Sequence, residues 1–455
     1  MITLPRARVS RANLSRVGWT TGSYAVVQVL RLANNVILAR LLAPELFGIM
    51  LIVNTVRTGI ELLSDIGIGQ NVVRAPDAEE PRFYNTAWTL QVIRGLLLGG
   101  LCLAASIPLS NFYDSPVLAK ILPVASLFFI FTGFESIGRA LLQKRIDVVR
   151  LGIFEIGTTI FSVIAYIVLA LITPTIWALM LGGVLSSAAL MLGSYLLIPG
   201  LRPKFAFDRD VAIRMFSFGR WVFLSTVVYF LAMNFDRLYM AKALPLAVLG
   251  VYGIARSLAD ILTLLANRLS NMVIFPMVAR ASDDREGLRQ ALTRSRPLLL
   301  AAAAVATSLF AALSDLIVGL LYDSRYHEAA QMLPILAFGV WFAVLATINE
   351  AVVMGIGRPV YSAIANVSKL ICLCIGLPVA VVYHGITGAV WVIAGSEAVR
   401  YLPLWWSQRR EGLPFGVQDI ALTAAAVGMF VLWRAALWAV GLASGIFAFT
   451  APSVF

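Results

Sequence analysis

Twelve apolar stretches, each long enough to cross a lipid bilayer as a helix, constrain this chain more than any other feature. A spanning helix needs about 20 predominantly apolar residues. The chain is 60% hydrophobic and 13% charged, whereas a soluble domain is about 45–50% apolar and about 25% charged. We therefore predict an all-α polytopic membrane protein, with one or two further helices in the tail 418–455, which Arg434 interrupts. The twelve spans are expected at residues 18–41, 47–73, 87–109, 117–138, 149–172, 176–198, 219–242, 247–278, 297–320, 330–354, 361–383 and 386–406.

Basic residues are distributed unevenly between the two sides of these spans. Cytoplasmic loops of membrane proteins carry an excess of Lys and Arg. The loops expected there carry Arg6, Arg8, Arg11 and Arg16; Arg139, Lys144, Arg145 and Arg150; Arg202, Lys204, Arg209 and Arg214; and Arg280, Arg285, Arg289, Arg294 and Arg296. The opposite loops carry little beyond Arg40, Lys120, Lys242 and Arg325. This bias places the N-terminus in the cytoplasm, and it explains the net charge of +12 without a nucleic-acid partner.

A weak internal repeat divides the spans into two halves. Residues 39–48 (ARLLAPELFG) and 241–250 (AKALPLAVLG) each run from Ala and a basic residue through a proline turn to Gly. Six spans per half give both halves the same orientation. We expect two parallel six-helix bundles related by a pseudo-twofold axis along the membrane normal. The expected divisions are an N-terminal lobe at 1–210, a C-terminal lobe at 211–410, and the extra helices at 411–455.

Four arginines lie deep inside expected spans: Arg31, Arg57, Arg256 and Arg268. An arginine at the bilayer centre costs about 2.5–3.5 kcal/mol on insertion scales. Four facing lipid would cost on the order of 10 kcal/mol, as much as the whole stability of a typical domain. They are therefore expected to face a watery cavity, and a cationic cavity favours an anionic substrate. Arg94 and Arg400 are expected nearer to helix ends, where long side chains reach the interface.

Acidic and amide side chains accompany these arginines. Arg57 and Glu61 in one half match Arg256 and Asp260 in the other, and four-residue spacing stacks each pair on one helical face. Each pair either lines the cavity or neutralises itself and only packs. Asn34 and Asn35 add polar groups to the first span. The acids expected as charge partners or as proton or sodium sites are Glu61, Asp65, Asp236, Asp260, Glu155 and Glu350.

Metal and cofactor chemistry finds little support in this sequence. Cys102, Cys372 and Cys374 lie within spans, and the chain has only two histidines. We expect no metal site, no cofactor and no catalytic residue. The loops, about twenty residues at most, are too short for a folded extramembrane domain.

Several short motifs resemble polysaccharide flippases of the Wzx type, in the multidrug/oligosaccharidyl-lipid/polysaccharide (MOP) exporter superfamily. Residues 41–48 read LLAPELFG and residues 62–70 read LLSDIGIGQ, as at the opening of that family. Residues 355–359 (GIGRP) and 385–389 (GITGA) also fit its pattern, with Pro378 between them. Their order and spacing carry the resemblance, which covers about residues 15–410.

The resemblance implies a V-shaped pair of six-helix bundles in a bacterial cytoplasmic membrane. Such flippases move undecaprenyl-pyrophosphate-linked oligosaccharides to the outer leaflet by alternating access, alongside polymerase and export-complex proteins. In related lipid II flippases, arginines of the first, second and eighth helices gather around the pyrophosphate. Arg31, Arg57 and Arg256 occupy those helices here. Coupling to a proton or a sodium gradient stays open.

Two other functions stay open at this point. A cation-coupled multidrug antiporter of the same superfamily needs an acidic cavity for its cationic drugs, whereas arginines dominate the polar helices of this chain. A membrane polysaccharide polymerase or glycosyltransferase needs a sizeable extracytoplasmic loop for its acceptor and catalytic groups. The sequence therefore favours a flippase that is not an enzyme.

Overall fold

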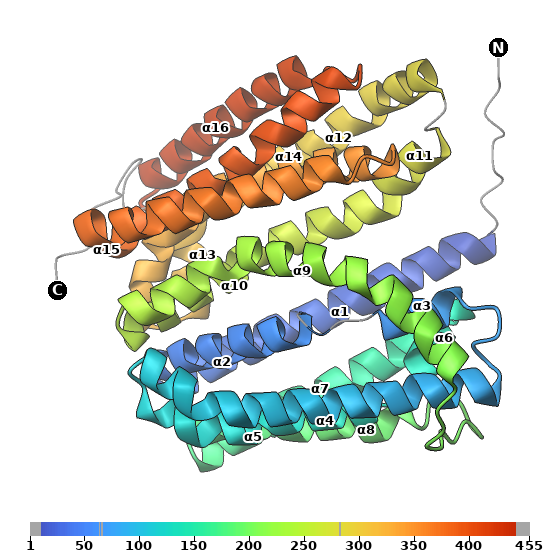
Figure 1. The fold of residues 1–455 in the computed structure, drawn as a ribbon. Helices are drawn as coiled ribbons and strands as arrows, with labels where there is room; N and C mark the ends of the chain where they lie inside the picture. Colours follow the sequence, from blue (N-terminus) through green and yellow to red (C-terminus); the bar gives the residue numbers. More distant parts are fainter. Residues whose placement is uncertain (1–10, 63, 65–66, 282–283, 443–455) are drawn as a thin grey trace. The chain divides into compact units, whose positions relative to one another are not determined.

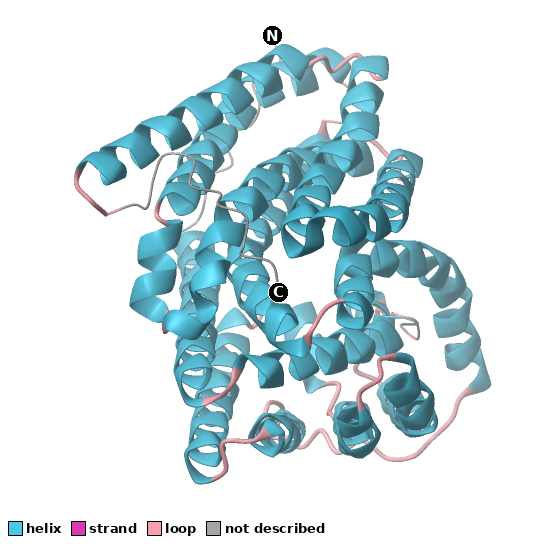
Figure 2. Ribbon diagram, turned by 90° about the vertical axis from the view of Figure 1, so that its left-hand side faces the viewer, coloured by secondary structure: helices cyan, strands magenta, loops and turns pink. Residues whose placement is uncertain are grey.

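The computed structural model describes residues 11–62, 64, 67–281 and 284–442. Within these ranges the regular structure is helical throughout, as Figure 2 shows by its uniform cyan ribbons. The chain forms two compact units (Figure 1). Unit 1 comprises Met1–Leu42 and Val56–Thr226, and unit 2 comprises Ala43–Thr55 and Val227–Phe455. The expected lobe boundary near residue 210 stays a prediction.

Unit 1 is a bundle in which α4 packs on α5, α1 packs on α7, and α8 packs on both α5 and α7. Two glycines allow α4 and α5 to approach closely, because a Cβ added at Gly95 would lie 2.6 Å from the Cα of Gly133. The unit contains α1 (Arg11–Leu41), the second part of α2 (Pro44–Leu62), α3 (Ile68–Arg74), α4 (Pro81–Phe112), α5 (Pro116–Phe134), α6 (Gly138–Lys144), α7 (Val148–Ile172), α8 (Ile176–Ser194) and the first part of α9 (Arg209–Ala243).

Unit 2 is organised around α14, which packs against α10, α12, α13 and α15. In the most apolar stretch of the segment Ser324–Gly355, which contains α14, 83% of the residues are buried inside the protein. The corresponding share for α7 of unit 1 is 6%. The unit contains the first part of α2, the second part of α9, α10 (Leu246–Leu269), η1 (Ser270–Ile274), α11 (Phe275–Arg280), α12 (Arg285–Ala312), α13 (Ser314–Leu321), η2 (Ser324–Tyr326), α14 (His327–Gly355), α15 (Val360–Arg410) and α16 (Gly416–Ala439).

Local sequence explains where several of these helices begin and bend. The Asp284 side chain accepts a hydrogen bond from the Gly287 N–H at 2.9 Å and so caps α12. Gly385 interrupts α15 with φ 55° and ψ −142°, a non-helical conformation that favours glycine, so α15 consists of two helical segments that correspond to the two spans expected on either side of it. After α10 the chain winds as a π-helix over η1, a feature frequent at functional sites.

Nine helices within the described ranges are long and apolar enough to cross a membrane, so the chain is a polytopic, all-α membrane protein as predicted. They cover ten of the expected segments, including the first tail helix, α16. The other three, α1, α2 and α9, are helical but carry many of the polar residues predicted to form a site. The expected span 47–73 is wrong in one respect: α2 ends at Leu62, and α3 starts only after Gly67, whose φ is 68°.

The two linkers of the internal repeat meet each other within unit 2. A Cβ on Gly48 would lie 2.1 Å from the carbonyl oxygen of Leu246, and a Cβ on Gly250 would lie 1.9 Å from that of Pro44. Gly250 lies 202 residues after Gly48, and Leu246 lies 202 residues after Pro44, which is the offset between the two linkers. Such reciprocal contacts are typical of residues around a twofold axis. They support the repeat locally, while the symmetry of two whole bundles stays a prediction.

A buried arginine holds α16 against the rest of unit 2. The Arg296 side chain is 0% exposed and donates hydrogen bonds to Asn349 at 2.7 Å, Asp419 at 3.0 Å and Gln418 at 3.0 Å. Its guanidinium also lies over the Phe415 ring. Arg296 was expected among the cytoplasmic loop charges, and that prediction is wrong, because four-residue spacing places it on the buried face of α12 with Leu292 and Leu300.

Arg434 anchors the other end of α16. It donates to the carbonyl of Ala312 at 3.1 Å and to Asp315 at 2.8 Å, at the junction of α12 and α13. The arginine that interrupts the apolar tail is therefore buried and paired inside unit 2, which explains how α16 tolerates it.

Candidate functional site

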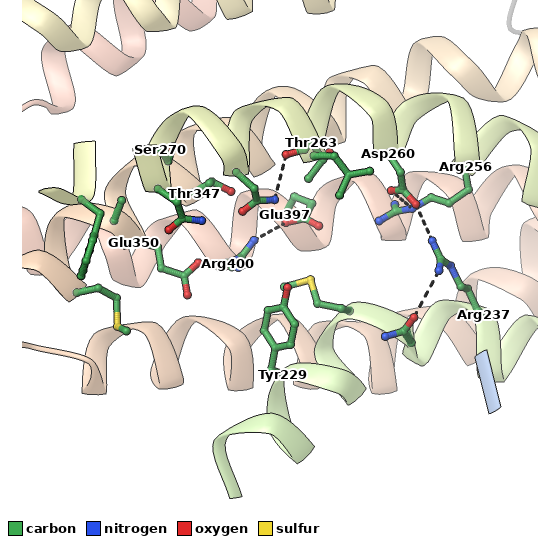
Figure 3. Close-up of a pocket in the computed structure, with 18 residues that line it drawn as sticks. Tyr229, Arg237, Arg256, Asp260, Thr263, Ser270, Thr347, Glu350, Glu397 and Arg400 are labelled. Carbon is green, nitrogen blue, oxygen red and sulfur yellow. Dashed lines mark hydrogen bonds and ion pairs between the residues drawn. The ribbon is translucent and has the colours of Figure 1, made fainter. Parts of the chain in front are cut away.

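Unit 2 contains a cavity of about 540 Å³ at the depth of its membrane-spanning helices. Figure 3 shows side chains from α9, α10, η1, α14 and α15 pointing into it. Most lining residues are polar or charged, which is unusual inside an apolar bundle. Polar groups at this depth are expensive and generally mark a functional site.

One end of the cavity is formed by a carboxylate between two arginines. Asp260 accepts a hydrogen bond from Arg237 Nη2 at 2.7 Å and lies 3.0 Å from Arg256 Nε (Figure 3). Arg256 and Asp260 share a face of α10 through their four-residue spacing, whereas Arg237 comes from α9. We call Arg237, Arg256 and Asp260 the Asp260 group.

The other end holds a second arginine network. Arg400 donates to Glu350 at 2.5 Å and to Asn366 at 3.1 Å, and its Nη1 lies 3.6 Å from Glu397. The Lys369 ammonium, itself buried, binds Glu397 at 2.7 Å. Arg400 was expected to reach the membrane interface. That prediction is wrong, because its position on α15 directs it into this network.

The formal charges of the cavity cancel. Its lining contains three arginines, Arg237, Arg256 and Arg400, and three carboxylates, Asp260, Glu350 and Glu397. By itself unit 2 therefore offers a charge-balanced site. The cationic excess predicted for the cavity is therefore not present in the lining that unit 2 provides.

Neutral polar groups complete the lining. Thr263, Asn267 and Asn271 follow one another along α10 and η1, and Thr347 faces the cavity from α14. Amides and hydroxyls of this kind hydrogen-bond to sugar hydroxyls. The arginines can hold phosphate or carboxylate groups bidentately. Over the described part of the chain, no cluster of three His, Cys, Asp or Glu residues could hold a metal ion.

Comparison with known families decides the classification. A model of a family described as polysaccharide biosynthesis proteins matches residues 37–331, more than half of the chain. The chain belongs to this family. Its cavity is therefore that of a polysaccharide biosynthesis protein, and the resemblance read from the short motifs is confirmed.

Curated relatives of this family member act in several polysaccharide pathways. Lipopolysaccharide biosynthesis protein WzxC of Escherichia coli (strain K12) is 24% identical over 61% of this chain and 56% of its own length. Teichuronic acid biosynthesis protein TuaB of Bacillus subtilis (strain 168) is 22% identical over 88% of this chain and 82% of its own. Succinoglycan biosynthesis transport protein ExoT of Rhizobium meliloti (strain 1021) is 25% identical over 70% and 65%. The match thus spans little more than half of WzxC and most of TuaB.

Solved structures share the overall fold of this family member. The lipid II flippase MurJ in an inward closed conformation matches with a TM-score of 0.70 at 14% identity, over 93% of this chain and 98% of the other. An inward-facing multidrug transporter of the MATE family matches with a TM-score of 0.65 at 15% identity, over 92% and 96%. The predicted MOP-type fold is confirmed.

The residues predicted for unit 2 divide into those that line the cavity and those that do not. Arg256, Asp260 and Glu350 line it. Asp236 lies behind the lining, where it accepts a hydrogen bond from the Tyr252 hydroxyl at 2.5 Å. Arg268, near the end of α10, does not contribute to the lining.

The residues predicted for unit 1 are more loosely held. Arg57 is half-buried, lies over the Phe128 ring and is 3.9 Å from Glu61. Arg31 on α1 is exposed, and Glu155 on α7 lies 3.9 Å from Arg139.

The amides of α1 are half-buried side chains. Asn34 has a buried Oδ1 without a hydrogen-bond partner, and Asn35 lies beside it on the same helix. Asp65 lies outside the described residues. The substrate-binding and ion-coupling roles of all these residues stay predictions.

Two of the arginines that line the cavity, Arg237 and Arg400, were not predicted from the sequence to belong to the site. Arg400 was expected at the interface because it lies near the end of an expected span, and Arg237 was not among the residues predicted to form the site. A usable signal existed in their spacing: Asn234 precedes Arg237 by three positions, and Glu397 precedes Arg400 by three. Such spacing stacks a partner on the same helical face.

Proposed function

We propose that this protein is a flippase that carries an undecaprenyl-pyrophosphate-linked oligosaccharide across the bacterial cytoplasmic membrane for surface polysaccharide synthesis. The observation that carries the proposal is a polar cavity, about 540 Å³ in volume, inside the membrane-spanning helices of a polysaccharide biosynthesis protein. Arginines would hold the anionic diphosphate, and the amides and hydroxyls would meet the sugars, while the prenyl chain stays in lipid. The relative named as a transport protein and the fold shared with a lipid II flippase support this function.

The proposal assigns the diphosphate to Arg31, Arg57 and Arg256. Charge-assisted hydrogen bonds from guanidinium to phosphate are about twice as strong as neutral ones. Alternating exposure of the cavity to the two sides would then complete transport. Coupling to a proton or sodium gradient belongs to the same proposal, with Glu350 as the candidate carboxylate, because it lines the cavity and accepts hydrogen bonds from Ser362 and Arg400.

The decisive experiment uses the purified full chain in proteoliposomes with a prenyl-diphosphate oligosaccharide in the inner leaflet. A lectin or glycosidase outside the vesicles would report the arrival of the glycan. We expect arrival with the wild-type chain and its loss with Arg57→Ala, while Arg139→Lys, which keeps its charge outside the cavity, transports normally. A wild-type chain that moves no lipid-linked glycan under any imposed proton or sodium gradient contradicts the proposal.

A multidrug antiporter is the second candidate, because the MATE fold also matches and three carboxylates line the cavity. Against it, each carboxylate has an arginine partner, so no net negative charge attracts a cationic drug. An export assay with cationic dyes separates the candidates: accumulation of dye unchanged by the protein supports the flippase.

Short connections argue against a polymerase or glycosyltransferase. The longest connection between described helices is 195–208, joining α8 to α9. A stretch of that length does not form a folded catalytic domain. Incubation of the purified chain with lipid-linked glycan should therefore give no elongated product.

We also propose that the N-terminus faces the cytoplasm. The loops expected on that side are joined in unit 1, where Arg145 binds Glu79 at 2.8 Å and Arg214 binds Asp77 at 2.9 Å. Labelling single cysteines in these loops in intact cells and in lysed cells tests the orientation. If these cysteines are labelled already in intact cells, the N-terminus faces the opposite side of the membrane and the proposed orientation is wrong.

A further inference from the structure

We propose that Asp260 occupies the place of a substrate phosphate in the ligand-free protein, so that Arg237 and Arg256 form a diphosphate-binding pair that Asp260 holds until the substrate arrives. This inference rests on the proposed flippase function and deepens it. It adds Arg237 to the binding residues and makes Asp260 an internal competitor rather than a packing partner.

The geometry of the Asp260 group supports competition. One carboxylate lies between two guanidinium groups from different helices, 2.7 Å from Arg237 and 3.0 Å from Arg256. A guanidinium fork binds a carboxylate and a phosphate through the same arrangement of donors. A phosphate in this position would therefore meet the donors that now face Asp260.

Asp260 leaves some of these donors unused. The Nε–H groups of Arg237 and Arg256 are buried and have no hydrogen-bond partner. For Arg256 the nitrogen is within ion-pair distance of Asp260, but the N–H does not point at it well enough for a hydrogen bond. Buried donors in proteins are nearly always satisfied. A diphosphate, which offers more acceptor oxygens than one carboxylate, can satisfy both.

The surroundings give Asp260 somewhere to move. Its side chain is 29% exposed and borders the cavity, so it can turn away from the arginines without entering an apolar environment. Thr263 and Asn267 lie further along the same helix (Figure 3 labels Thr263) and provide hydrogen-bonding groups there. Arg237 is steadied from behind by Asn234, whose Oδ1 lies 3.5 Å away.

The other cavity arginine is a poorer candidate for the same role. Arg400 lies among Glu350, Glu397 and Asn366, and Glu397 is fixed in turn by buried Lys369. Displacing one carboxylate there leaves the other in place. In the Asp260 group, by contrast, displacement of the single carboxylate of Asp260 frees both Arg237 and Arg256.

A competitor of this kind explains how a site can bind an anion and still release it. Two bare arginines in a low dielectric would hold a diphosphate tightly, because charge interactions strengthen away from water. The returning carboxylate compensates the arginines as the substrate leaves. Asp260 thereby lowers the affinity of the site for the substrate and speeds the release of the substrate.

The test measures anion binding to the purified full chain in nanodiscs by calorimetry. The probes are inorganic pyrophosphate and farnesyl diphosphate, with farnesol as the uncharged control. We expect Asp260→Asn to bind pyrophosphate about tenfold or more tightly than wild type, since it removes a negative charge about 3–4 Å from the ligand. Arg237→Ala and Arg256→Ala should each weaken binding of both diphosphates. Tighter binding of farnesyl diphosphate than of pyrophosphate points to a lipid head group, and equal binding to a free phosphate.

Matched variants keep the outcome decisive. Asp315→Asn breaks an ion pair of unit 2 outside the cavity and should leave affinity unchanged. Glu350→Gln removes a charge from the same cavity, and we expect at least a threefold smaller gain than for Asp260→Asn. An equal gain from both would mean that only the overall potential matters, which overturns the inference. If Asp260→Asn is poorly folded by thermal melting, Asp260→Ser replaces it with the same expected sign.

Transport assays separate this inference from the proposed function. Wild-type transport of lipid-linked glycan combined with unchanged pyrophosphate affinity in Asp260→Asn refutes the competitor role alone. Absence of wild-type transport refutes the flippase proposal. If both hold, Asp260→Asn should lower the KM for the lipid-linked glycan and also lower kcat.

Discussion

Two arginine clusters of unit 2 have similar components and different surroundings. Arg296 is fully buried, donates to three side chains on α14 and α16, and lies over Phe415. Arg256 is 14% exposed, faces Asp260 and borders a cavity. An arginine among many fixed partners stabilises the packing of helices. Both arginines have a buried Nε–H without a hydrogen-bond partner, so it is the open volume beside Arg256 that makes this arginine available to a ligand. The difference predicts that stability and transport depend on different arginines.

The largest effect on stability is expected at Arg296. Arg296→Met leaves the Asp419 carboxylate buried without its cation, which should lower the free energy of unfolding by about 3–5 kcal/mol. Thermal melting in detergent measures it, and Arg296→Lys should recover part of the loss. If Arg296→Met unfolds with the same free energy as the wild type, Arg296 does not stabilise the helix packing and the distinction between the two arginine clusters is refuted.

A smaller loss is expected at Arg434. Arg434→Leu frees the carbonyl of Ala312 and the carboxylate of Asp315, which is partly exposed and can reach water. We expect a decrease of about 1–3 kcal/mol. The double variant with Asp315→Asn should lose less than the sum of the two single variants, because the residues share one ion pair.

Arg256 should affect ligand binding far more than stability. Arg256→Ala leaves Asp260 paired with Arg237, so the free energy of unfolding should change by less than about 1 kcal/mol. Pyrophosphate affinity should fall about 30-fold, equivalent to about 2 kcal/mol. Parallel melting and calorimetry test this split, and a stability loss as large as that of Arg296→Met would assign Arg256 a packing role.

Arg57 should have the smallest stability effect of the four arginines. Its pair with Glu61 is half-exposed and 3.9 Å long, and such pairs contribute about 0–1 kcal/mol. Arg57→Ala should nevertheless abolish glycan transport while the protein remains in the membrane. Normal transport by this variant would remove Arg57 from the proposed site.

Acidic pH should loosen unit 1 outside the membrane, with a modest effect. Hydrogen bonding to Arg214 holds the pKa of Asp77 below its ordinary value of 3.8, and Arg145 lowers that of Glu79 below 4.5. A lowered pKa means that the stabilisation is present above the ordinary pKa and is lost as pH falls through the folded value. The protection of residues 75–80 against hydrogen exchange, relative to the intrinsic exchange rate at each pH, should therefore fall below about pH 4, and Asp77→Asn should remove part of this pH dependence.

The contacts within unit 2 show where prediction from sequence ends. The i, i+4 spacing of Arg256 and Asp260 predicted that they share a face, and the structure pairs them. The spacing had no information about Arg237, which reaches Asp260 from another helix. Likewise the sequence predicted Arg296 to be a loop charge, whereas in the structure its partners on α14 and α16 surround it.

The sequence by itself determined that the chain spans a membrane many times, which helices carry polar residues, and which linkers repeat. These properties follow from apolar length and from spacing along one helix, both local quantities. Only the tertiary structure decided which arginines are packing anchors and which border a cavity. That depends on the rotation of each helix against its neighbours, and rotation is fixed by side-chain packing among segments far apart in the chain. Asp260, predicted as a stacking partner of Arg256, is in the folded protein also the partner of Arg237 from a second helix, α9.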